Sequence, residues 1–277
     1  TQAFRVPGDN RKIFLIASIG SGFAAIFGLP LAGAIYGLEI TALGKLRYSA
    51  VFPCFVSALV ASQIPELFHI SHPHQYYVVS SFPDFNFTTI SSLIVAGLLF
   101  GFVARIFIAS ILFVSKQLNH YVRFMPFRPM VGGILIMLMT IIVGHQKFNG
   151  LGVGSIISSF YIDLPVTDFL GKIIFTATTL GSGFKGGEIT PLFFVGTTFG
   201  NALGQFLPLP ISLLAGLGLV SLFAGASKAP LTSIVLAIEL FGADIAQYAV
   251  ITCLLAYLFS GNCGLYIQQN LKLRGEE

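Results

Sequence analysis

Apolar residues dominate the chain in long runs, and short polar or glycine- and proline-containing breaks separate these runs. The runs cover residues 13–38, 49–61, 90–115, 129–144, 169–181, 190–207, 211–226, 229–242 and 245–260. Several of them are shorter than the roughly 20 residues that a straight membrane span needs. Glycine and proline interrupt the pattern near Pro30, Pro191 and Pro230. Broken, half-length helices of this kind are typical of transporters and channels, in which helix ends lie at mid-membrane depth.

Charged residues are too scarce for a water-soluble protein of this length. Asp, Glu, Lys and Arg make up 9% of the 277 residues, whereas an average soluble domain carries about 25%. Hydrophobic residues make up 55%. Fifteen basic and 11 acidic side chains cannot coat a soluble body of this size. The composition therefore predicts an integral, multi-pass membrane protein whose main partner is the lipid bilayer.

The positive charge does not indicate a nucleic-acid partner. The net charge is +4, but the basic residues stand in ones and twos between apolar runs, as loop anchors of membrane proteins do.

Cys54, Cys253 and Cys263 are too few for a disulfide framework, and none belongs to a CxxC pair. A zinc or redox site is therefore not expected.

Enzymatic or metal chemistry finds little support in the polar residues. His69, His72 and His74 have the spacing HxxHxH within the polar connection 62–89. With no carboxylate or cysteine beside them, they are expected to be solvated loop residues and not metal ligands. The apolar runs contain no Ser/His/Asp constellation. We therefore expect no enzyme, no metal site and no cofactor.

An internal repeat links the two ends of the chain. Residues 23–40 read FAAIFGLPLAGAIYGLEI, and residues 223–240 read FAGASKAPLTSIVLAIEL. A proline and a glutamate stand nine positions apart in both copies, which apolar bias alone explains poorly, although chance similarity between two apolar helices remains an alternative. If the copies are inverted, a site between them near the midplane is expected. The two helix-end carboxylates, Glu39 and Glu239, are expected to reach loop groups or water.

The stretch 181–191, GSGFKGGEITP, holds the strongest chemical signal. Its glycines let the backbone approach a ligand closely, and Pro191 suits the first turn of the apolar helix that follows. A helix that begins inside a membrane offers unpaired N–H groups and a partial positive charge, for which an anion is the natural occupant. The alternative is an ordinary tight turn with a capped helix. The glycines of this loop are Gly181, Gly183, Gly186 and Gly187, and Ser182 lies between the first two.

Glu188 lies within this glycine-rich turn and has two possible roles. It could cap the helix N-terminus, which favours carboxylates. It could instead be an intramembrane titratable group that serves ions or protons. A protonated Glu can donate a hydrogen bond to a small, strongly accepting anion, which would tie anion passage to proton movement. Tyr266, near the end of the chain, is either an interfacial aromatic or a hydroxyl directed into a pore.

Together, these segments resemble the CLC family of anion channels and proton-coupled anion exchangers. Residues 28–33 with Glu39 are similar to the family segment AxFxAPLAGxxFxxE, and residues 228–239 are similar to APLTxxxxxxE. The stretch 181–191 is similar to the anion-binding loop GSGxPGGxFxP, and Tyr266 stands where the family has its pore tyrosine. The resemblance implies an all-α, polytopic membrane protein with inverted repeats and broken, tilted helices. It also implies a homodimer with one pore per subunit.

The resemblance also implies which residues hold the anion. The backbone amides of Glu188 and Ile189, flanked by Gly187 and Thr190, occupy the family's anion-binding positions, and the hydroxyl of Tyr266 would complete the site. A Glu at position 188 and the pattern GxxGLYxxQ around Tyr266 are similar to the fluoride-selective branch. Ile40 replaces the internal proton-transfer Glu of chloride/proton exchangers, which the fluoride branch also lacks.

Three functions follow from the resemblance. We expect fluoride/proton antiport that exports fluoride; the alternatives are a chloride channel or chloride/proton exchanger, and a transport-inactive fragment or scaffold. The first anion loop and the GxEGx gating motif are absent, so the chain is expected to be the C-terminal two thirds of a longer protein.

The expected organisation is a single partial transmembrane domain. Residues 12–165 would form the remainder of the first repeat with connecting helices, and residues 166–277 would form the second repeat with the anion loop and the pore tyrosine. No cytosolic regulatory domain is expected. The resemblance implies a location in the inner membrane of a bacterium.

Overall fold

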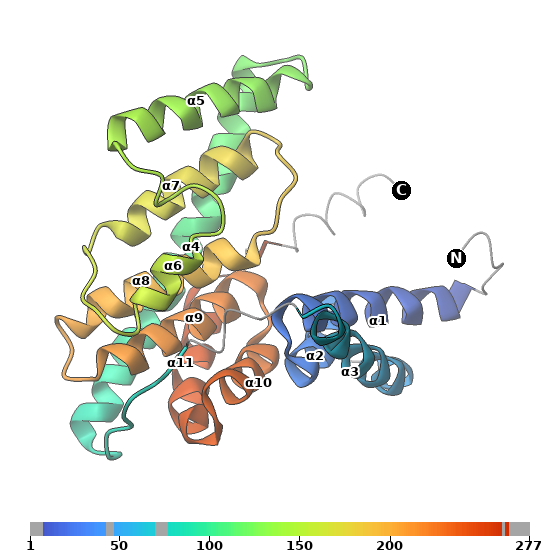
Figure 1. Cartoon of the computed structure of the whole chain (residues 1–277), viewed down its shortest axis with the longest axis vertical. Coiled ribbons are helices and arrows are strands. Elements are labelled where there is room, and N and C mark those ends of the chain that lie inside the picture. Colours follow the sequence, from blue (N-terminus) through green and yellow to red (C-terminus); the bar gives the residue numbers. More distant parts are fainter. Residues whose placement is uncertain (1–7, 43–46, 70–76, 262–263, 266–277) are drawn as a thin grey trace.

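The structure, a computed structural model, describes residues 8–42, 47–69, 77–261 and 264–265, and all regular elements in these ranges are helices (Figure 1). In chain order they are α1 (Gly8–Phe27), α2 (Pro30–Ala42), η1 (Tyr48–Ala50), α3 (Val51–Leu67), α4 (Phe87–Tyr121), α5 (Phe127–Val143), α6 (Val153–Ser158), α7 (Asp168–Gly181), α8 (Ile189–Gly204), α9 (Ile211–Ser227), α10 (Pro230–Phe241), η3 (Ala243–Ile245) and α11 (Ala246–Phe259). The prediction of an all-α protein is confirmed.

Most helices begin and end within a few residues of the predicted apolar runs. The run 13–38 divides at Gly28 into α1 and α2, as the glycine and proline signals indicated. Two details differ from the prediction. The short helix α6 was missed, and α3 continues through Pro65 to Leu67 into the segment predicted as a loop. Ser62 and Pro65 are buried in α3, because this turn still packs inside the protein.

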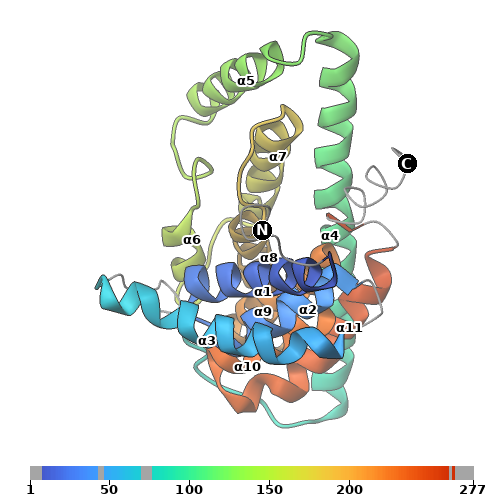
Figure 2. The ribbon, with the colours of Figure 1, turned by 90° about the vertical axis from the view of Figure 1, so that its right-hand side faces the viewer.

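Helix lengths fit a membrane protein with broken helices. In the described part of the chain, two helices are long and apolar enough to cross a membrane, Tyr48–Leu67 and Phe87–Tyr121. At 35 residues, α4 is about 52 Å long, which exceeds the roughly 30 Å of a hydrocarbon core. It runs the length of the molecule beside α7, α9 and α11 (Figure 2). By contrast, α10 has 12 residues and α7 has 14, so neither spans alone.

The pair α8 and α9 forms the centre of the protein, and α4, α7, α10 and α11 pack around it (Figure 1). Every residue of α9 from Ser212 to Ser227 is buried. The two helices cross with their backbones in close approach, since a Cβ on Gly218 would lie 2.1 Å from the carbonyl oxygen of Gly196. Small residues at such crossings allow backbone contact, which drives helix association in membranes.

Helices α1, α2 and α3 form a second, smaller cluster at one side of the molecule (Figure 1). A close crossing joins α1 and α2, because a Cβ on Gly20 would lie 2.7 Å from the carbonyl oxygen of Gly33. The cluster joins the main body through α2, which packs on α10, and through the rings of Phe23 and Phe223, whose centroids are 6.1 Å apart. These two phenylalanines are a matched pair of the sequence repeat.

The two copies of the repeat break their helices in the same way. Gly28, after α1, has φ +68°, and Lys228, after α9, has φ +61°. Both positions therefore adopt the left-handed conformation, and a helix with proline at its first position follows each of them: Pro30 begins α2 and Pro230 begins α10. Since the backbone as well as the sequence repeats, the duplication is supported independently of apolar bias.

Glu39, near the end of α2, caps the start of α10. Its carboxylate accepts hydrogen bonds from the backbone N–H of Leu231 at 3.0 Å and of Thr232 at 2.7 Å. The hydroxyl of Thr232 donates a further bond at 2.6 Å. A carboxylate at this place satisfies helix-start N–H groups and complements the positive end of the helix dipole.

Glu239, near the end of α10, returns the same contact to the start of α2. Its carboxylate accepts from the N–H groups of Leu31 at 2.9 Å and Ala32 at 2.7 Å. The end of each helix thus lies at the start of the other, so α2 and α10 are antiparallel, as inverted repeats require. The expectation that Glu39 and Glu239 reach loop groups or water is wrong, because each finds unpaired backbone donors in the opposite repeat.

Removing either carboxylate should destabilise the junction of the repeats. We expect Glu239→Ala to lower the free energy of unfolding by about 2 kcal/mol, because two helix-start N–H groups lose a charged acceptor. Glu39→Ala should cost more, since a side-chain hydroxyl also loses its acceptor. Unfolding in mixed micelles measures both changes. Glu66→Ala, at an exposed position of α3, is the control and should change stability by less than about 0.5 kcal/mol. Equal stability of all three variants would contradict the capping role.

Candidate anion site

The anion loop predicted at 181–191 lies between α7 and α8. Gly181 ends α7 and is buried together with Ser182, whose hydroxyl donates to the carbonyl of Thr178 at 2.5 Å. Ser182 also lies against α5, because a Cβ on Gly132 would be 2.1 Å from its hydroxyl oxygen. Gly183 has φ +91°, a conformation that favours glycine. The start of the loop is therefore held firmly on α7.

The middle of the loop is open. Residues from Gly183 to Gly187 are exposed. A Cβ on Gly187 would meet nothing within 4 Å, and one on Gly186 would meet only the side chain of Leu180 at 3.9 Å. The backbone of these two glycines therefore borders free space, so a small ligand can approach it closely.

Glu188 occupies the N-cap position of α8, but its side chain makes no capping hydrogen bond. Its Oε2 atom is buried and has no hydrogen-bond partner. Of the two roles considered for this carboxyl group, capping does not apply. A buried carboxyl oxygen without a partner at the positive end of a helix leaves room for a ligand to supply the missing bond.

The remaining residues assigned to the site form the first turn of α8. Ile189 begins the helix, Ile189 and Thr190 are half-buried, and Pro191 is fully buried in the first turn. The first N–H groups of a helix have no partner within it, so this turn presents backbone donors beside Glu188. The structure therefore brings together all the predicted loop residues from Gly181 to Pro191. Tyr266 lies outside the described residues.

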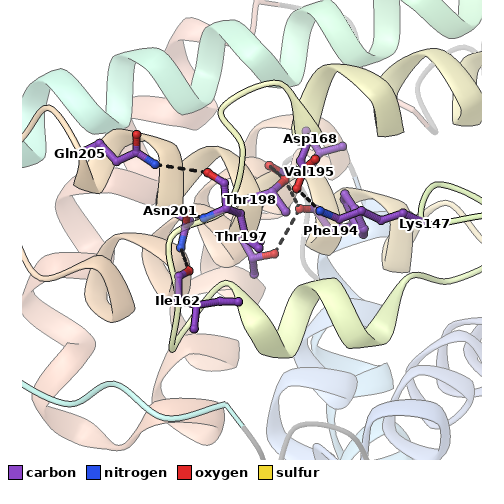
Figure 3. Close-up of polar contacts among 10 residues, drawn as sticks. Lys147, Ile162, Asp168, Phe194, Val195, Thr197, Thr198, Asn201 and Gln205 are labelled. Carbon is purple, nitrogen blue, oxygen red and sulfur yellow. Dashed lines mark hydrogen bonds and ion pairs between the residues drawn. The ribbon is translucent and has the colours of Figure 1, made fainter. Parts of the chain in front are cut away.

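Buried polar contacts hold the C-terminal end of α8 (Figure 3). Asn201 is fully buried and uses both ends of its amide: Oδ1 accepts from the N–H of Leu164 at 2.9 Å, and Nδ2 donates to the carbonyls of Ser159 and Ile162, each at 2.8 Å. Gln205 donates to the carbonyl of Leu164 at 3.2 Å. These bonds hold the segment after α6 against the C-terminal end of α8.

Lys172, a buried cation near the loop, was not predicted from the sequence motifs. It is the lone charged residue of the apolar run 169–181, and an ionisable residue inside such a run is a signal of function. Its ammonium group donates to the carbonyls of Phe148 at 3.0 Å and Gly150 at 2.6 Å.

Lys228 holds the end of α11 against the corner between α9 and α10. Its ammonium group donates to the carbonyl of Tyr257 at 3.1 Å, to the hydroxyl of Ser260 at 2.6 Å and to the carbonyl of Gly261. Near by, the N–H of Leu265 donates to the carbonyl of Ala226 at 3.0 Å. These contacts tie the segment immediately before position 266 to the end of α9.

Comparison with known proteins identifies the family. A family model described as voltage gated chloride channel matches residues 2–261. The chain belongs to this family, the CLC family. CLC proteins are integral membrane channels and transporters for anions, so membership in the family confirms the expectation of a membrane protein.

Two curated relatives match almost the whole chain. The "Chloride/fluoride channel protein" of Pseudomonas syringae pv. tomato is 42% identical over 98% of this chain and 61% of its own length. The "H(+)/Cl(-) exchange transporter ClcA" of Vibrio parahaemolyticus is 28% identical over 100% of this chain and 64% of its own length. The chain thus spans less than two thirds of the length of these relatives.

Solved CLC structures share the fold. A CLC-type fluoride/proton antiporter aligns with a TM-score of 0.85 at 29% identity, over 90% of this chain and 62% of that one. A slow cyanobacterial Cl−/H+ antiporter aligns with a TM-score of 0.79 at 21% identity, over 100% of this chain and 68% of that one. The predicted CLC fold, with inverted repeats and broken helices, is confirmed.

Because the backbone of Lys228 is left-handed, replacement by glycine tests how much its side chain contributes to stability. Lys228→Gly should relieve about 1 kcal/mol of backbone strain and lose three charge-assisted hydrogen bonds. We expect a net loss of about 1–2 kcal/mol in the free energy of unfolding, whereas Lys228→Arg should retain most of the stability. Chemical unfolding in detergent measures both. A glycine variant as stable as the wild-type protein would show that the side chain contributes nothing.

Proposed function

We propose that this chain is the larger part of a fluoride/proton antiporter that exports fluoride. The observation that carries the proposal is Glu188, a carboxyl group with a buried, partnerless oxygen at the open start of α8. When protonated, this group is a hydrogen-bond donor, and fluoride is a small anion that accepts hydrogen bonds strongly. When ionised, the same group repels an anion. The protonation state of Glu188 and the binding of an anion are therefore coupled at a single position.

The remaining donors come from the first turn of α8. The backbone amides of Glu188 and Ile189 would hold the anion, Gly187 and Thr190 would flank it, and the hydroxyl of Tyr266 would complete its coordination. The open space beside Gly186 and Gly187 is consistent with this arrangement. No cofactor enters the mechanism: the transported species are F− and H+, and no bond of a substrate is made or broken.

One curated relative and one solved structure support the fluoride branch. The name of the Pseudomonas syringae relative includes fluoride, and the structure that aligns at 29% identity is a fluoride/proton antiporter. Ile40 stands where chloride/proton exchangers carry an internal proton-transfer Glu. The second candidate is chloride conduction or chloride/proton exchange, because the Vibrio parahaemolyticus relative bears that name. A transport-inactive fragment or scaffold is the third.

The setting of the transporter follows from the family. We propose that the working unit is a homodimer in the inner membrane of a bacterium, with one pore per subunit. We also propose that an upstream portion of the protein supplies the gating carboxylate and the other wall of the anion path. The exposed loop from Gly183 to Gly187 is the surface that this portion would cover.

The decisive measurement is ion flux from liposomes that hold the full-length protein. The wild-type protein should move fluoride at least about 10-fold faster than chloride, and fluoride efflux should drive proton uptake. Glu188→Gln removes the titratable proton but preserves size, so it should reduce fluoride selectivity by about 10-fold or more, equivalent to about 1.4 kcal/mol. Glu66→Gln, on the exposed face of α3, is the matched control. Equal rates for fluoride and chloride, or unchanged selectivity in Glu188→Gln, would refute the fluoride assignment.

A further inference from the structure

Basic and aromatic side chains gather at the corner between α4 and α5. This basic corner, residues 116–128, covers the end of α4, the turn after it and the first residues of α5, and it lies at the end of the molecule remote from α10 (Figure 2). Lys116 and Arg123 are exposed there, and Arg128 is half-buried. The exposed aromatic side chains between these cations are Tyr121, Phe124 and Phe127.

No carboxylate balances these three cations. Residues 85–162 contain no Asp or Glu, and within the described residues no ion pair involves the three side chains. The other end of α4 carries the opposite charge, because Asp84, just before the helix, and Asp244 line the same pocket. Basic loops of membrane proteins face the cytoplasm, where the surface of the membrane is anionic. The basic corner is therefore expected on that side.

The basic corner begins where α4 leaves the apolar part of a membrane. The apolar run 90–115, whose one charged residue is Arg105, ends directly before Lys116, and α4 continues to Tyr121. The run is about 39 Å long, so a tilt fits it into a hydrocarbon core of roughly 30 Å. Lys116 and the residues after it then lie at the level of the lipid headgroups, where aromatic side chains also gather.

Arg128 is held in an orientation that suits a phosphate group. Its Nε atom donates to the carbonyl of Val122 at 2.9 Å, across the turn that joins the two helices. The N–H of Phe127 closes this turn by donating to the carbonyl of Phe124 at 3.1 Å. In the part of the chain that the structure describes, the two terminal nitrogens of Arg128 donate no hydrogen bond. A planar guanidinium can bind two phosphate oxygens at once.

We propose that the basic corner binds the headgroup of an anionic phospholipid. The guanidinium of Arg128 would hold the phosphate, Arg123 and Lys116 would add positive charge beside it, and the exposed rings would lie at the boundary between headgroups and acyl chains. An acidic protein segment would match the cations but would not explain exposed rings directly after an apolar run. The binding of lipid does not rest on which ion the protein transports.

The two helices of the basic corner also hold the start of the anion loop. A Cβ on Gly181 would lie 3.0 Å from the backbone nitrogen of Ser115, the residue before Lys116. A Cβ on Gly132 of α5 would lie 2.1 Å from the hydroxyl oxygen of Ser182. A headgroup that fixes the corner therefore also fixes the start of the loop, so anionic lipid should speed transport by preorganising it. This step, unlike the binding of lipid, rests on the proposed anion site.

The first experiment measures binding of a short-chain phosphatidylglycerol to the full-length protein in detergent, with phosphatidylcholine of the same chains as the neutral probe. Phosphatidylglycerol should bind about 10-fold more tightly, and Lys116→Gln combined with Arg123→Gln should remove most of this preference. Arg11→Gln combined with Lys12→Gln removes the same charge from exposed positions of α1 and should leave the preference unchanged. An unchanged preference in the first double variant, or an equal loss in both, would overturn the proposal.

The second experiment tests the link to the anion loop by halide flux from liposomes. The wild-type protein should be about 3-fold faster when about one quarter of the phosphatidylcholine is replaced by phosphatidylglycerol. The Lys116/Arg123 double variant should lose this response, and the Arg11/Lys12 double variant should keep it. Since all variants share the same liposomes, repulsion of the halide by the membrane surface is equal among them.

The outcomes separate this inference from the proposed function. If phosphatidylglycerol binds at the corner but does not change flux, the link to the loop is wrong. If fluoride is transported selectively while the Lys116/Arg123 double variant binds phosphatidylglycerol as the wild-type protein does, only the lipid site fails. If that variant loses the lipid but the wild-type protein moves fluoride and chloride equally, only the fluoride assignment fails.

Discussion

The structure depends on how the N–H groups of interrupted helices are satisfied where water is scarce. Each helix start leaves backbone donors unpaired, and an unpaired donor in an apolar environment costs several kcal/mol. At the starts of α2 and α10 the protein supplies the acceptor itself, because Glu239 and Glu39 each reach across to the opposite repeat. The two carboxylates therefore make the two breaks mutually dependent and join the repeats to each other.

The start of α8 is a third interrupted helix, and among the described residues no carboxylate of the opposite repeat bonds to its N-terminus. The side chain of Glu188 makes no capping bond there and has one buried oxygen without a partner. The difference between α8 and the other two helices is functional in the proposed mechanism. A carboxylate of the protein stays bonded to the N–H groups at a helix start. Where the protein supplies no such acceptor, a mobile anion can bind to these groups and leave again.

The parts of this architecture that depend on local sequence could be predicted. Glycine and proline predicted the helix breaks before Pro30 and Pro230, and the glycine-rich loop with Pro191 predicted the start of α8. Local pattern could not show where Glu39 and Glu239 point, because their partners lie about 200 residues away and depend on antiparallel packing of the repeats. A short helix such as α6, with six residues, carries too little periodicity to be recognised.

Lys228 is a second residue whose role local sequence could not predict. Its sequence neighbours predict a helix break, and a glycine would suit the left-handed conformation better, as Gly28 does in the first repeat. The lysine is explained by hydrogen bonds to the carbonyl groups of Tyr257, near the end of α11, and of Gly261, just after it. The strain at this position is thus offset by a contact that only the folded chain brings within reach.

The charges around the anion loop also bear on release, which a transporter needs as much as binding. The N–H groups at a helix start attract an anion, and attraction alone would prevent its release. Glu188 changes this balance by one full charge when it gains or loses a proton, and its buried Oε2 atom has no hydrogen-bond partner. In the proposed mechanism, protonation of Glu188 therefore sets whether the loop holds a halide or expels it.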